Sequence, residues 1–84
     1  MKTYRTKFEA RDGITRYAEF REPTVIELKE IAANALSFTK MEKLYDNLVI
    51  SAINEPPASL PLFLRDFKVR TLWMLFHQIR TNEV

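Results

Sequence analysis

The 84-residue sequence has no cysteine, one histidine and one glycine, and each shortage excludes a class of chemistry. Without cysteine the chain has no disulfide, no thiol nucleophile, no cysteine zinc site and no iron–sulfur cluster. His77 alone leaves little room for imidazole catalysis, and Gly13 alone does not make a glycine-rich phosphate cradle. The sequence therefore predicts no catalytic residues, no metal site and no cofactor.

Long apolar runs are also missing. The longest, Leu62 to Leu64 and Leu72 to Phe76, are far shorter than the roughly 20 residues that a membrane-spanning helix needs. The N-terminus, Met1 to Arg5, is basic, but alternating charged residues follow it instead of the apolar core of an export signal. We therefore expect an intracellular, soluble protein with no membrane partner.

The net charge of +2 is unevenly distributed. Residues 1–21 hold six Lys or Arg against three Asp or Glu, residues 22–55 hold three against six, and residues 56–84 hold four against two. No stretch combines clustered cations with the aromatic or glycine-rich signatures of nucleic-acid-binding motifs. Composition therefore favours a protein partner, and the basic N-terminal segment leaves a nucleic acid as the alternative.

The patterning predicts one small α+β domain over residues 1–84, an N-terminal β-hairpin followed by three α-helices. The hairpin covers about residues 3–21, with strands at 3–10 and 14–21. A three-residue loop ending at Gly13 pairs Ala10 with Ile14 and places Gly13 at a left-handed bulge position.

In this register Arg5 lies opposite Glu19 on a charged face of the hairpin. That face also carries Lys7, Glu9 and Tyr17. The other face is apolar and is expected to consist of Tyr4, Phe8, Ala10, Ile14, Ala18 and Phe20.

Two capping boxes mark the first two helices. Thr24 with Glu27 starts a helix over about 25–36, and Thr39 with Glu42 starts one over about 40–53. The first helix is expected to bury Val25, Leu28, Ile31, Ala32 and Ala35. The second is expected to bury Met41, Leu44, Tyr45, Leu48, Val49, Ala52 and Ile53. Two prolines then make residues 54–60 an extended linker.

A third helix is predicted over about 61–80, and it is more apolar than its place in the chain requires. One stripe consists of Leu64, Phe67, Thr71, Leu72, Leu75 and Ile79. Further apolar residues extend this stripe beyond the arc that a hairpin and two short helices cover: Phe63, Val69, Trp73, Met74 and Phe76.

Two interpretations of this excess remain open. Either Trp73 and Phe76 cap the apolar face of the hairpin, or part of the helix contacts a partner. Aromatic, Met and Arg residues are enriched at the centres of protein–protein interfaces. On that basis the candidate protein-binding residues are Phe63, Phe67, Arg70, Trp73, Met74, Phe76 and Arg80.

Carboxylates spaced one helical turn apart are the first candidates for acid–base chemistry. Glu27 with Glu30, and Glu42 with Asp46, lie on the polar faces of amphipathic helices, where solvated charge near a lysine is the expected role. Asp66 and His77 are separated by about 16 Å along one helix axis and do not meet within a chain. An enzyme is not predicted.

The chain contains a charged hairpin, the phrase Phe20-Arg21-Glu22-Pro23-Thr24-Val25-Ile26-Glu27, an amphipathic helix pair, and Leu60-Pro61-Leu62-Phe63. It ends with a helix closing on Leu75-Phe76-His77-Gln78-Ile79-Arg80-Thr81-Asn82-Glu83-Val84. This order resembles the N-terminal part of the baseplate hub assembly proteins of T-even-type tailed phages. Those proteins have Phe-Arg-Pro-Phe-Thr-x-x-Glu at a helix start, then Leu-Pro-x-Phe, then Leu-Arg-x-x-Ser-x-Gly-Glu. The chain is similar, more loosely, to small phage tail assembly chaperones.

The resemblance implies a non-enzymatic phage morphogenesis protein, either a tail or baseplate assembly chaperone or a minor tail component. It implies a phage tail or baseplate protein as partner, with a homo-oligomer also compatible, and a location in the host cytoplasm or in the virion. A structural subunit of the finished particle would share every sequence feature with a chaperone. The alternative function is a small nucleic-acid-binding regulator that uses the basic hairpin through Arg5, Lys7, Arg16 and Tyr17.

Overall fold

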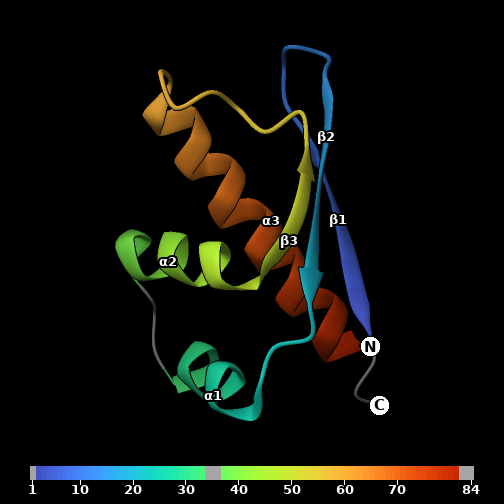
Figure 1. Cartoon of the computed structure of the whole chain (residues 1–84), viewed down its shortest axis with the longest axis vertical. Helices are drawn as coiled ribbons and strands as arrows, with labels where there is room; N and C mark the ends of the chain where they lie inside the picture. The colour runs from blue at the N-terminus through green and yellow to red at the C-terminus, as the bar shows by residue number, and fades with distance from the viewer. Residues whose placement is uncertain (1, 34–36, 82–84) are drawn as a thin grey trace.

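The computed structural model describes residues 2–33 and 37–81, which form an α+β fold (Figure 1). The strands form one antiparallel sheet in the order β1-β2-β3. The predicted fold class is confirmed, including the N-terminal hairpin and the long C-terminal helix. In chain order the elements are β1 (Thr3–Glu9), β2 (Thr15–Arg21), α1 (Val25–Ala33), α2 (Phe38–Leu48), β3 (Val49–Ile53) and α3 (Pro61–Thr81).

Strands β1 and β2 pair in the register that the sequence predicts, with Arg5 opposite Glu19. The Gly13 amide donates a hydrogen bond to the Ala10 carbonyl oxygen at 3.2 Å, which closes the three-residue loop. Gly13 has a φ of 77°. Most side chains are strained in this left-handed conformation, so the single glycine lies where the loop requires one.

The inner face of the hairpin differs from the predicted set in three residues. Thr6 and Arg16 are buried there, because strand alternation places both on the same side as Phe8. The Thr6 hydroxyl donates to the Ala18 carbonyl oxygen at 3.4 Å, which satisfies this polar group within the core. Ile14 is exposed near the turn instead of buried.

Residues 49–53 form strand β3, so the prediction of a second helix continuing to residue 53 is wrong. Helix α2 ends at Leu48, and Val49 adopts an extended conformation while its amide donates to the Tyr45 carbonyl oxygen. The segment is rich in β-branched residues, which lose side-chain freedom in a helix and fit a pleated strand. Pairing with the second edge of β2 also satisfies backbone groups that a two-stranded hairpin would leave open.

The ladder between β2 and β3 contains a bulge in which Ile50 is the extra residue. Val49 and Ala52 pack against the core, as predicted for them within a helix. Ile53 is exposed, because the strand turns it to the outer face of the sheet. A helix and a strand over this segment would therefore both bury Val49 and Ala52, whereas only a helix would bury Ile53.

Helix α1 begins at the predicted capping box. The Glu27 amide donates to Thr24 Oγ1 at 3.2 Å, and the Thr24 amide donates to Glu27 Oε1 at 2.8 Å. Leu28 packs against the core, but Val25 is 68% exposed and not buried as predicted. The first turn projects from one end of the molecule (Figure 1). Residues 34–36, with the side chains of Ile31, Ala32 and Ala35, lie outside the described part.

Helix α2 begins two residues before the predicted start. Its N-cap is Ser37 and not Thr39, and the Lys40 amide donates to Ser37 Oγ at 3.3 Å. Serine and threonine both cap well, so the earlier hydroxyl adds half a turn to the helix. The predicted buried face is confirmed at Met41, Leu44, Tyr45 and Leu48.

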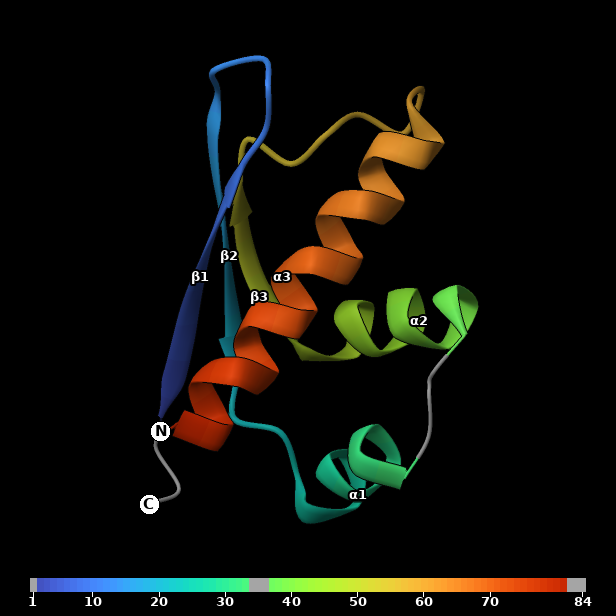
Figure 2. The same cartoon turned by 180° about the vertical axis from the view of Figure 1, so that it is seen from behind.

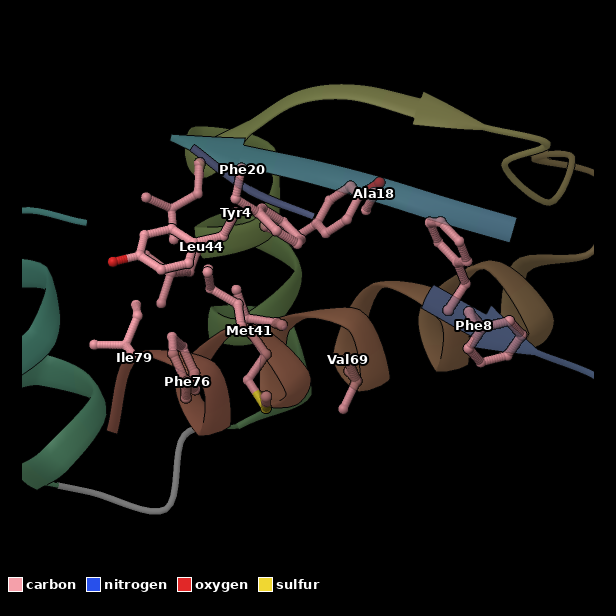
Figure 3. Packing of buried hydrophobic residues seen from close by; sticks show 14 residues of the cluster. Tyr4, Phe8, Ala18, Phe20, Met41, Leu44, Val69, Phe76 and Ile79 are labelled. Atoms are coloured by element: carbon pink, nitrogen blue, oxygen red, sulfur yellow. The ribbon is translucent and has the colours of Figure 1, made fainter. Parts of the chain in front are cut away.

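Helix α3 crosses one face of the sheet, with α2 beside it (Figure 2). The centre of the core is aromatic. The fully buried Phe67 ring lies 5.5 Å from that of Phe8 and 6.1 Å from that of Tyr45, and the Tyr45 ring lies 5.5 Å from that of Phe20. The steep interplanar angles are the favourable edge-to-face arrangement. The sheet and both helices therefore share a single core (Figure 3).

The outer edge of β1 is contacted by the C-terminal part of α3. Gln78 Nε2 donates to the Arg5 carbonyl oxygen at 2.9 Å. This carbonyl points away from β2, so the bond occupies one position on the open edge. Arg5 and Lys7 add charges that oppose pairing with a second β1 strand. Strand addition at this edge is therefore disfavoured.

Candidate protein-binding surface

Helix α3 is buried on one side and exposed on the other. Its buried side faces the sheet and α2, and consists of Phe67, Val69, Thr71, Leu72, Leu75, Phe76 and Ile79. The hydroxyl of Thr71 donates to the Phe67 carbonyl oxygen at 2.8 Å, so this polar residue is satisfied within the helix. Trp73 and Met74 remain outside this packing and are 52% and 40% exposed.

Two of the predicted binding residues belong to the core. Phe67 is completely buried and Phe76 is 5% exposed, which corrects the expectation that both are available to a partner. Phe67 faces the aromatic residues of the sheet and α2. Helix α2 and both strands of the hairpin contact α3, so the buried side of this helix includes both aromatic residues. Phe67 and Phe76 therefore pack in the core, beneath the exposed side of α3.

Phe63 and Arg16 form a separate contact at the hairpin end of α3. The Arg16 guanidinium lies 4.8 Å from the centre of the half-buried Phe63 ring. Arg16 Nε donates to the Asn54 carbonyl oxygen at 2.7 Å, and its Nη2 lies 2.9 Å from Asp12 Oδ2. Arg16 is only 6% exposed, which corrects the expectation that it is available on the basic hairpin to contact a nucleic acid. Phe63 faces this contact and the Phe8 ring, 6.2 Å away.

The other four predicted residues lie on the outward side of α3: Arg70, Trp73, Met74 and Arg80. Asp66 and His77 are exposed on the same side. We call these six residues, Asp66, Arg70, Trp73, Met74, His77 and Arg80, the outer α3 surface. Five of them succeed one another at intervals of four, three, four and three residues, which aligns them in one row along a helix.

Trp73 is the central member of this row. Its ring contacts that of Phe76 edge-on, at 5.9 Å between centroids and an interplanar angle of 86°. Trp73, Phe76, His77, Arg80 and Thr81 line a shallow depression at this end of the helix. All five belong to α3, so the depression has walls from one helix only. Such a shape suits a side chain of another protein better than an enclosed small molecule.

The charges of the outer α3 surface are mixed. Asp66 Oδ1 lies 3.3 Å from Arg70 Nε, and both side chains are more than half exposed. Exposed ion pairs of this kind contribute about 0.2–1 kcal/mol, because water screens them. Either residue can therefore exchange its partner at small cost.

The carboxylates of α2 are bound to cations of α3. Glu42 Oε1 accepts from Arg65 Nε at 2.9 Å, and Asp46 Oδ1 accepts from Lys68 Nζ at 3.0 Å. These contacts connect two helices, whereas the sequence predicted solvated charge near a lysine of the same helix. Their arrangement supports packing of α2 on α3, and it does not present two free carboxylates to a substrate.

The outer face of the hairpin carries both signs of charge. Lys7 Nζ lies 2.9 Å from Glu9 Oε1, and the Arg5 guanidinium lies 5.2 Å from the centre of the Tyr17 ring. Glu19 is directly opposite Arg5. Alternating charge of this kind does not form the continuous row of cations that tracks a phosphate backbone.

Among residues 2–33 and 37–81, no three side chains of the metal-ligating types come together. Within the same part of the chain, every helix falls short of the length and apolar character that crossing a membrane requires.

Asp66 and His77 are two members of the outer α3 surface that were not among the predicted binding residues. The signal that identifies them is their spacing with Arg70, Trp73 and Arg80, which places all five in one row. That signal becomes clear only when the buried side of α3 is known.

Comparison with models of protein families, with curated proteins and with solved structures finds no match for this chain. The surface described above, together with the order of sequence motifs, is therefore the basis for a functional proposal.

Proposed function

We propose that this chain is a non-enzymatic phage morphogenesis protein that binds a tail or baseplate subunit through the outer α3 surface. It acts as an assembly chaperone or as a minor component of the tail. The observation that carries the binding part is Trp73, more than half exposed on the longest helix and adjacent to the exposed Met74. The phage part depends on the motif order that resembles baseplate hub assembly proteins.

The composition of the surface is that of an interface centre. Tryptophan and arginine are the residue types most often responsible for binding energy, and methionine is enriched where apolar contacts adapt to a partner. Trp73 rests on the buried Phe76, so its ring is supported on one side and open on the other. Arg70 and Arg80 lie around it, where charge sets orientation and association rate more than affinity.

The nucleic-acid alternative has less support. Arg16, one of its four expected contact residues, is buried among Asp12, Asn54 and Phe63. Lys7 is paired with Glu9. The hairpin therefore offers fewer free cations than the sequence suggested, and the protein-binding function is the one we retain.

Co-purification with the products of the neighbouring genes tests the proposal. The tagged chain is expected to capture one tail or baseplate subunit in stoichiometric amount. Trp73→Asp is expected to abolish this capture, since it places a charge at the centre of the apolar contact. Ile26→Asp is the matched control, because Ile26 is another exposed apolar residue and lies on α1, away from the surface. Circular dichroism verifies that both variants are folded.

Two outcomes contradict the proposal. One is a genomic neighbourhood without tail or baseplate genes. The other is capture by the Trp73→Asp variant at the level of the unmodified chain. Binding to DNA with a steep salt dependence that Lys7→Glu reduces would instead support the hairpin as a phosphate-binding surface.

A further inference from the structure

The exposed row on α3 has the spacing of a helix–helix contact. Its members Asp66, Arg70, Trp73, His77 and Arg80 are separated by four, three, four and three residues, the repeat by which one helix contacts another along a straight seam. The row lies on the exposed side of α3, opposite the buried residues of that helix. Within it Arg70 also reaches the sheet, since its guanidinium lies 5.9 Å from the centre of the Phe8 ring. The row therefore presents one exposed helix face with a single apolar residue, Trp73, at its centre.

Two residues of opposite charge lie at equal distances on either side of Trp73 in this row. Asp66 precedes it by seven residues and Arg80 follows it by seven, so each lies about 10 Å from Trp73 along the helix axis. When two α3 helices run antiparallel about a twofold axis at Trp73, Asp66 of each copy lies opposite Arg80 of the other. Because the axis is twofold, the ion pair between Asp66 and Arg80 forms twice in the dimer.

We propose that the outer α3 surface binds a second copy of this chain, in an antiparallel contact of two α3 helices centred on Trp73. The two Trp73 rings meet at the axis and exclude water from each other. Asp66 exchanges its exposed contact with Arg70, at 3.3 Å, for Arg80 of the second copy. The charge pairs define the register, and the apolar centre supplies the binding energy.

The charge pattern selects this arrangement over others. In a parallel pair of α3 helices, Asp66 would meet Asp66 and Arg80 would meet Arg80, which costs free energy. Pairing through the β1 edge would bring Arg5 and Lys7 of two copies together, and Gln78 already occupies an edge carbonyl. The antiparallel α3 contact places Asp66 opposite Arg80, and it requires no change in the fold of either copy.

This inference goes beyond the proposed function, because it states what covers the same surface before a tail or baseplate subunit binds. The second copy and the subunit then compete for Trp73. A dimer would keep this apolar residue away from unrelated proteins until its partner is present.

Sedimentation velocity and light scattering on the full chain, at increasing concentration, test the proposal. We expect a reversible monomer–dimer equilibrium that Trp73→Asp shifts to the monomer. Asp66→Arg alone and Arg80→Asp alone are each expected to weaken dimerisation about tenfold, because symmetry makes each change remove two ion pairs and create two like-charge contacts. The double variant, Asp66→Arg with Arg80→Asp, is expected to restore the affinity of the unmodified chain.

Restoration by the double variant is the decisive result, since a loss of folding would not be reversed by a second charge change. Lys43→Glu is the matched control, as Lys43 is an exposed cation on α2 and lies outside the outer α3 surface. A chain that stays monomeric at every concentration overturns the proposal. So does a dimer that the single charge reversals leave unchanged, or one that the double variant fails to restore.

These outcomes are separable from those of the proposed function. A monomeric chain that captures a tail or baseplate subunit contradicts only the dimer. A dimer that responds to the charge reversals but captures no such subunit contradicts only the phage function.

Discussion

Arg21 and Glu27 form a two-pronged ion pair at the junction of β2 and α1, with Nη1 2.9 Å from Oε1 and Nη2 3.0 Å from Oε2. The same carboxylate accepts a hydrogen bond from the Thr24 amide at 2.8 Å. One side chain therefore caps α1 and attaches that helix to the sheet. This polar connection matters because Val25, in the first turn of α1, is largely exposed.

Stability should fall on acidification through a window set by Glu27. The hydrogen bonds from the Arg21 guanidinium lower the pKa of Glu27 from 4.5 to about 2, against the opposing effect of burial. The contribution is complete above about pH 4.5 and is lost as pH falls toward 2, because the unfolded chain binds the proton first. Urea unfolding between pH 7 and pH 2 measures it. Glu27→Gln should flatten this dependence and cost roughly 1–2 kcal/mol at neutral pH; equal pH slopes for both proteins would contradict the assignment.

Arg16 should be far more important for stability than an ordinary hairpin arginine. Arg16→Ala removes the contacts with Asp12, Asn54 and Phe63 and leaves the Asn54 carbonyl without its donor, at a cost of about 2–4 kcal/mol. Arg16→Lys should recover little of this, since an ammonium cannot bind two acceptors with a planar fork. The free energy of unfolding in urea is the measurement, and the exposed Arg11→Ala is its control. Equal effects of the two alanine variants would show that Arg16 is solvated.

Truncation of Phe67 should destabilise the protein much more than truncation of Trp73, although both are aromatic residues of α3. Phe67→Ala leaves a cavity between the sheet and the helices and should cost about 3–5 kcal/mol. Trp73→Ala should cost less than about 1 kcal/mol, because half of the ring is already in water. Thermal unfolding followed by circular dichroism distinguishes them. A large loss for Trp73→Ala would place it in the core and remove the basis for the binding surface.

Gly13→Ala should destabilise the hairpin by about 1 kcal/mol. A Cβ at this position meets no atom within 4 Å, so the cost comes from the φ of 77° and not from a clash. Gly13→Asn should recover part of the loss, because asparagine tolerates the left-handed region better than alanine. Urea midpoints of the two variants provide the comparison, and an alanine variant as stable as the unmodified chain would exclude strain in the loop.

Features encoded by neighbouring residues were predictable from the sequence. Alternation around Gly13 identifies the hairpin register, and the spacing of Thr24 and Glu27 identifies the start of α1. Strand β3 was not predictable in the same way. Residues 49–53 continue a helical spacing, and they become a strand because the open edge of β2 offers hydrogen bonds.

The candidate site was predictable only in part for a similar reason. The interface-type composition of α3 identified Trp73, Met74 and the two arginines of the outer α3 surface. It did not separate them from Phe67 and Phe76, because burial depends on how many elements cover the helix. The burial of Arg16 likewise depends on Asn54, 38 residues later in the chain.

The central position of β2 has a consequence for synthesis of the protein. Residues 3–21 are complete well before β3 is made, so the hairpin emerges from the ribosome with one side of β2 unpaired. That side stays open until residues 22–48 have been added and the chain has returned to it. Closing this long segment is an entropic cost that the first hairpin does not face. The time between the two events is when the nascent chain is most exposed to pairing with the wrong strand.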